Sequence, residues 1–76
     1  MSSFRDFLNE GKEFYVIALD DKTYLSDKFK FTGNIQRAYV FPTFNDAIAY
    51  EERNSNKIDG YTEIYKVKDN KFTLMT

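Results

Sequence analysis

The stretch "VFPTFNDAIAYEER", residues 40–53, joins an apolar segment to an amphipathic one and decides the fold. Pro42 has no backbone N–H to give to a strand ladder, so it ends any strand that precedes it. Thr43 suits the N-cap position, and Asp46 three residues later resembles the acidic partner of a capping box. The pattern predicts a helix over residues 44–53.

The predicted helix has one apolar face. Phe44, Ala47 and Ile48 recur at helical spacing and are expected to face a core. The last residues of the helix, Glu51, Glu52 and Arg53, are expected to lie in solvent. Because so short a helix is marginal alone, it must pack against another layer of the protein.

Segments typical of short strands lie on both sides of this helix. The predicted strands are residues 13–19, 23–26, 35–41, 61–67 and 71–75. Residues 28–31 also alternate, as a third short strand or as the end of the second one. The expected fold class is therefore α+β, a small antiparallel sheet of about five strands with helix 44–53 packed on it and a short N-terminal helix.

Composition narrows the function classes. The chain has 76 residues. Residues 11–76 are expected to form one α+β domain, and residues 1–10 a separate helix before it. Cys and His are both absent, which removes disulfides and the usual zinc ligands. A net charge of −1 with interspersed signs does not favour direct binding to nucleic acid. No apolar run is long enough for a membrane span, and no apolar core of a secretory signal is visible near the start.

No set of residues has the spacing of a catalytic site. Asp20-Asp21 is interpreted as a hairpin turn, where Asp bonds its own backbone, rather than as a metal site. Ser26 has no His or second base to activate it. We therefore expect a protein that is not an enzyme, with no catalytic residue, cofactor or metal.

The tyrosines raise the question of a binding surface. Six tyrosines are too many for all of them to be buried in so small a core, and exposed Tyr and Arg are typical of binding hot spots. In strand 61–67, Tyr61, Tyr65 and Val67 should share one face, with Ile64 on the other. Such rings could simply cover the sheet, could bind a protein, or could stack on nucleobases. The candidate partner-binding residues are Arg37, Tyr39, Tyr61 and Tyr65.

The first eleven residues, "MSSFRDFLNEG", form a separate pattern. Phe4, Phe7 and Leu8 lie at helical spacing, and Gly11 suits the left-handed residue that ends a helix. A helix of about two turns must dock on its own domain or on a partner.

This N-terminal pattern resembles the capsid-targeting sequence of internal head proteins of T-even-like bacteriophages. The matching residues are Met1, Phe4, Arg5, Asp6, Phe7, Leu8, Glu10 and Gly11, while Ser stands at positions 2 and 3, where the family often has Lys or Thr. The resemblance implies docking on the head scaffold through Phe4, Phe7 and Leu8, and cleavage by the prohead protease between Glu10 and Gly11. Residues 35–52 are similar to a strand–turn–helix phrase of small phage proteins, an analogy of fold only.

The expected function is that of a small phage accessory protein, packaged or made early, in the virion or the host cytoplasm. It would bind and inhibit a host protein such as a defence or restriction nuclease. Two alternatives remain open: a structural internal head protein without a host target, and an unrelated small interaction domain. The oligomeric state is left open.

Overall fold

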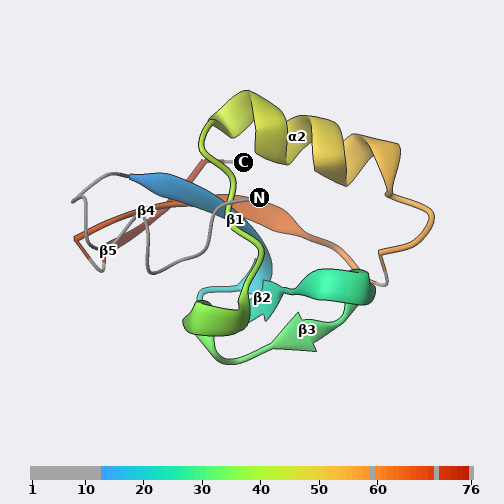
Figure 1. The fold of residues 1–76 in the computed structure, drawn as a ribbon, viewed down its shortest axis with the longest axis horizontal. Helices are drawn as coiled ribbons and strands as arrows, with labels where there is room; N and C mark the ends of the chain where they lie inside the picture. Colours follow the sequence, from blue (N-terminus) through green and yellow to red (C-terminus); the bar gives the residue numbers. More distant parts are fainter. Residues whose placement is uncertain (1–12, 59, 70, 76) are drawn as a thin grey trace.

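The computed structural model describes residues 13–58, 60–69 and 71–75. Their sheet contains five antiparallel strands in the order β3-β2-β1-β4-β5. The strands are β1 (Phe14–Asp20), β2 (Thr23–Leu25), β3 (Phe31–Thr32), β4 (Glu63–Lys68) and β5 (Lys71–Leu74). The helix α2 (Phe44–Arg53) packs across one face (Figure 1). The α+β class and the antiparallel sheet with one helix on it are thus confirmed, while the N-terminal helix lies outside the described residues.

Helix α2 begins and ends where the sequence predicts. The hydroxyl of Thr43 accepts a hydrogen bond from the Asp46 backbone N–H at 3.1 Å, which satisfies one of the free donors of the first turn. Ala47 is fully buried, and Phe44 and Ile48 pack beside it. Glu51 differs from the prediction because it is half-buried and hydrogen-bonded to Thr62.

Alternation along β1 builds a core on each side of the sheet. Phe14, Val16 and Ala18 enter one buried cluster, whereas Ile17 enters the other, beneath α2. The cluster on the side away from α2, called here the lower core, also holds Tyr24, Ala38, Val40 and Val67, with Ile35, Tyr65 and Phe72 packed against it.

The predicted strand over residues 35–41 is wrong. Residues Ile35–Arg37 form a 3₁₀ helix, because the Asn34 side chain accepts from the Gln36 N–H at 3.0 Å and closes the turn. Past Ala38 this segment becomes extended but forms no strand; it makes an isolated bridge, in which Phe41 and Tyr15 exchange bonds of 2.8 and 2.9 Å.

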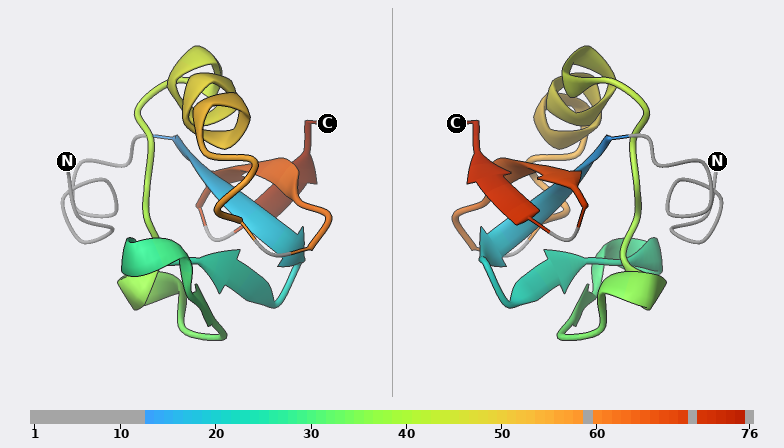
Figure 2. Two further views of the ribbon diagram at one scale, coloured as in Figure 1. Left: turned by 90° about the vertical axis from the view of Figure 1, so that its right-hand side faces the viewer. Right: turned by 90° about the vertical axis from the view of Figure 1, so that its left-hand side faces the viewer.

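These extended residues fill a gap between β1 and β2. The two strands pair only at Ala18–Tyr24 and Asp20–Thr23, so the first half of β1 is left without β2 beside it. The Tyr39 N–H bonds to Leu25 and Phe41 bonds to Tyr15, so residues 39–41 lie between the separated strands. Figure 2 shows this segment, yellow-green, passing the start of β1 on its way to α2.

Residues 28–31 also depart from simple alternation. Asp27–Phe29 is a 3₁₀ helix, and the third strand, β3, begins only at Phe31. Lys28 and Phe29 both have left-handed backbones, with φ of 57° and 60°. The Ser26 N–H and hydroxyl both bond to the Lys30 carbonyl, at 2.6 and 2.9 Å, and thereby close this loop.

Candidate binding surfaces

Tyr61 is the most exposed large hydrophobic side chain among the described residues, with 83% of its surface in solvent. It lies just before β4 rather than inside it, so it does not share a strand face with Tyr65 and Val67 as predicted. Gly60 before it has φ of +106°, a conformation that favours glycine. A Cβ at Gly60 would lie only 3.1 Å from Leu19 Cδ2, so the backbone here sits close against β1.

The residue after Tyr61 is also held in place. The Thr62 hydroxyl donates to Glu51 Oε2 at 2.6 Å, and both side chains are half-buried. This bond joins the last turn of α2 to the chain that enters β4. We call Leu19, Glu51, Gly60, Tyr61 and Thr62 the Tyr61 platform, which is the exposed ring together with the residues on either side of it and the two residues that these approach.

Tyr39 belongs to the packing under α2. Its ring meets Phe41 edge-on at 6.4 Å and Tyr50 at 5.7 Å, and its side chain is half-buried. Burial, and then the proximity of Tyr39, raises the pKa of Tyr50. Arg37, two residues earlier, is exposed at the end of its 3₁₀ helix.

Tyr65 lies on the opposite side of the sheet, at the lower core. Its ring packs edge-on against Phe72 at 6.4 Å. Burial raises the pKa of Tyr65, and the carboxylates of Glu63, Asp21 and Asp20 raise it further. The structure therefore does not bring Tyr39 and Tyr65 together, and the four candidate residues do not form one continuous surface.

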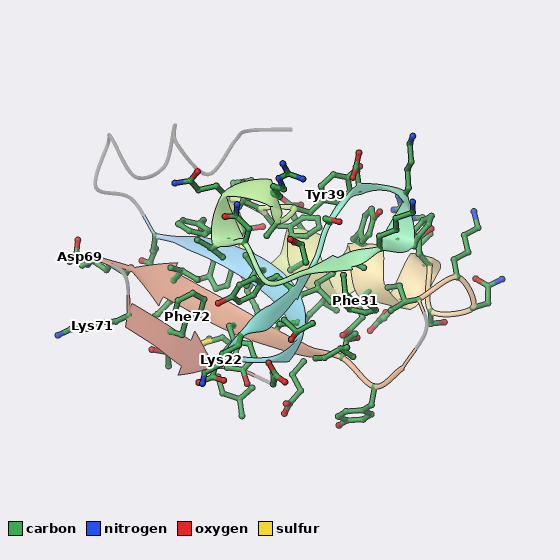
Figure 3. All side chains as sticks on the ribbon, turned by 90° about the horizontal axis from the view of Figure 1, so that it is seen from below. Lys22, Phe31, Tyr39, Asp69, Lys71 and Phe72 are labelled. Atoms are coloured by element: carbon green, nitrogen blue, oxygen red, sulfur yellow. The ribbon has the colours of Figure 1, made fainter. Side chains whose placement is uncertain are left out.

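Sequence reasoning did not identify the outer edge of β5 as a surface. Leu74 and Met75 are 52% and 39% exposed there, and the half-buried Phe72 lies on the same face of the strand as Leu74. Figure 3 shows Phe72 lying over the sheet and Lys71 extending outward at the hairpin end of the strand. The alternation of residues 71–75 does predict a strand, but which strand is last in a sheet depends on topology.

The residues considered for chemistry have structural partners. Asp20 Oδ1 accepts from the Lys22 N–H at 2.8 Å, which confirms that the Asp20-Asp21 pair forms a turn. The Ser26 hydroxyl is buried and donates to the Lys30 carbonyl. Within the described ranges there is no group of three or more acidic residues placed to hold a metal, and no helix long and apolar enough to cross a membrane.

The targeting and cleavage residues Phe4, Phe7, Leu8, Glu10 and Gly11 lie outside the described residues. Comparisons with protein-family models, with curated proteins and with solved structures find no match to this chain. The structure itself defines a five-stranded α+β fold, and its described residues expose large apolar side chains at the Tyr61 platform and at the edge of β5.

Proposed function

We propose that this chain is a small bacteriophage accessory protein that binds a host protein and inhibits it by steric block. Two features support the proposal: the N-terminal resemblance to capsid-targeting sequences and the exposed Tyr61. The host target would be a defence enzyme such as a restriction nuclease, met in the host cytoplasm after delivery from the virion or early synthesis.

The observation that carries the binding role is the setting of Tyr61. A tyrosine presents a large ring with few rotatable bonds, so ordering it in an interface costs little conformational entropy. The residues on either side of it are constrained, Gly60 by its backbone φ of +106° and Thr62 by its bond to Glu51. Aromatic anchors on rigid supports are typical of binding hot spots.

Affinity capture from host lysate tests the binding role, with quantitative mass spectrometry of what each variant retains. The wild type should enrich one host protein, and Tyr61→Ala should lose at least about tenfold of that enrichment. Asn45→Ala, an exposed change on the first turn of α2, is the matched control and should retain it. Equal capture by the wild type and Tyr61→Ala would show that Tyr61 does not contribute to the interface.

Purified virions test the phage assignment separately. Mass spectrometry should find the chain there, beginning at Gly11 after cleavage behind Glu10. Finding only uncleaved chain, or none, would contradict packaging. A chain that is packaged but captures only virion proteins would instead be a structural component of the head.

A further inference from the structure

At the outer edge of β5, only a few backbone N–H and C=O groups face away from β4 and are open to pairing with another strand. Met75 N–H donates to the Ile64 carbonyl at 2.8 Å, which makes these two a hydrogen-bonded pair of the β4–β5 ladder. Hydrogen-bonded pairs alternate along an antiparallel ladder, so Thr73 and Lys71 also turn their N–H and C=O groups toward β4. Phe72 and Leu74 therefore turn theirs toward the open edge.

This spacing makes the edge complementary to itself. Two copies of β5 running antiparallel, with Thr73 opposite Thr73 of the other copy, place each Phe72 opposite the Leu74 of its partner. Each such pair exchanges two backbone hydrogen bonds, so all the open groups of Phe72 and Leu74 in both copies are satisfied. Shifting the register by two residues leaves some of these groups without a partner.

The side chains of β5 also favour the register that sets Thr73 opposite Thr73 of the second copy. Phe72 and Leu74 lie on one face of β5, so the register sets an aromatic ring of one copy beside a leucine of the other on both sides of the twofold axis. Leu74 is 52% exposed in the single chain, and this contact would cover it. On the other face of the sheet, Lys71 lies opposite the partner's Met75.

Charge along the edge also favours an antiparallel copy. Lys68 and Lys71 are opposite one another at the hairpin end, both exposed, and neither forms an ion pair within the part of the chain that the structure describes. With Asp69 this end carries a net charge of +1. The other end of the edge lies near Tyr65, the residue opposite Leu74 in the ladder. The carboxylates of Glu63, Asp21 and Asp20 lie close enough to the Tyr65 hydroxyl to raise its pKa. Together with Lys22 in the turn between β1 and β2, these three carboxylates give that end a net charge of −2.

We infer that the chain forms a twofold dimer by pairing β5 with β5 of a second copy, centred on Thr73. The dimer joins the two sheets into one of ten strands and sets the basic end of each edge near the acidic end of the other. Since a strand of four residues buries less than the ~1,200 Å² of a standard interface, we expect a weak, concentration-dependent dimer. This inference is independent of the proposed host target.

Sedimentation equilibrium of the full chain, from about 10 μM to about 1 mM, tests the association. Wild type should pass from monomer toward dimer in this range. Leu74→Pro removes one open-edge N–H and leaves the ladder to β4 intact, because the Leu74 N–H points away from β4. It should raise the dimer dissociation constant at least about tenfold relative to Leu74→Ala, which shortens the side chain but keeps the donor. A chain monomeric at every concentration, or a dimer that Leu74→Pro leaves unchanged, would overturn the inference.

A single cysteine tests the register, since the natural chain has none. In the proposed dimer Thr73 and its symmetry mate form a pair without hydrogen bonds, about 4.5 Å apart at Cα, within disulfide reach. Thr73→Cys should therefore crosslink to a dimer under mild oxidation. Lys71→Cys faces Met75 of the partner and should crosslink at least about tenfold more slowly. Equal rates for the two variants would contradict the register.

Discussion

The ring of Tyr24 on β2 stacks on the ring of Phe72 on β5, with centroids 5.6 Å and planes 17° apart. Two strands, β1 and β4, separate β2 from β5 in the sheet. The contact is possible only because the sheet curls around the lower core until its outer parts approach each other (Figure 2). Aromatic side chains thus help to close the side of the sheet that faces away from α2.

Removing this contact should destabilise the whole fold. We expect Phe72→Ala to lower the free energy of unfolding by about 2 kcal/mol, because the half-buried ring contacts both Tyr24 and Tyr65. Leu74→Ala, at an exposed position two residues along, should cost less than about 1 kcal/mol. Urea unfolding followed by circular dichroism measures both, and equal losses would contradict the role of the stack.

Two glycines should respond in opposite ways to alanine. Gly60→Ala places a Cβ 3.1 Å from Leu19 Cδ2 on a backbone with φ of +106°, so we expect a loss of about 1–3 kcal/mol. Gly33→Ala meets only the Lys22 carbonyl at 3.7 Å, an ordinary contact, and should be neutral or stabilising by up to about 1 kcal/mol. Thermal unfolding of the two variants gives the comparison, and a neutral Gly60→Ala would show that this turn is not constrained.

Lys28 offers a stabilising change. Its left-handed backbone, φ 57° and ψ 27°, is unfavourable for a residue with a Cβ. We expect Lys28→Gly to raise the free energy of unfolding by about 0.5–1 kcal/mol. Lys30 is extended, with φ of −99°, so Lys30→Gly should instead lower it by about 0.5–1 kcal/mol. Urea midpoints that move in the same direction for both variants would refute this account of the loop.

The protein should lose stability in strong base through its tyrosines. Burial raises the pKa of Tyr24, and the carboxylates of Asp21 and then Asp20 raise it further. The folded state therefore keeps this proton at pH values where the unfolded chain has lost it. The stabilisation is fully present below about pH 10, the pKa of an unfolded tyrosine, and is lost as the pH rises through the folded-state value.

Urea unfolding at several pH values between about 9 and 11.5 measures this dependence. Tyr24→Phe removes the titrating group and should flatten the fall in stability above about pH 10. Tyr65 and Tyr50, whose pKa values are also raised by burial, should account for part of the remaining slope. An identical slope in wild type and Tyr24→Phe would exclude a contribution from Tyr24.

Local signals predicted the parts of the fold that local interactions fix. Thr43 caps α2 through a bond to Asp46, three residues away, so the start of this helix is encoded within one turn of sequence. Asp20 likewise forms its turn by a bond to Lys22, and residues 13–19 predict most of β1. In each case the stabilising partner is close along the chain.

The errors have one local cause and several distant ones. The local cause is Asn34, which closes a 3₁₀ turn at the start of residues 35–41 and so prevents the strand that their apolar and β-branched residues favour. A distant cause acts on the same segment, because the gap between β1 and β2 accepts only its end. Helical spacing predicts Glu51 in solvent, but the Thr62 hydroxyl, eleven residues later in the chain, donates a hydrogen bond to it. The exposure of Tyr61 and the open edge of β5 depend in the same way on the final strand order.

The bridge between Tyr15 and Phe41 has a consequence for how the protein opens. Phe41 lies two residues before the N-cap of α2, so the segment that is hydrogen-bonded to the start of β1 leads directly into the helix. Releasing Phe41 frees the Tyr15 amide and at the same time undocks the beginning of α2, where Phe44 contacts the Tyr15 ring at 6.0 Å. We therefore expect the start of β1 and α2 to open together, so that native-state hydrogen exchange measures similar opening free energies for their amides although β2 and β3 lie between them in the chain.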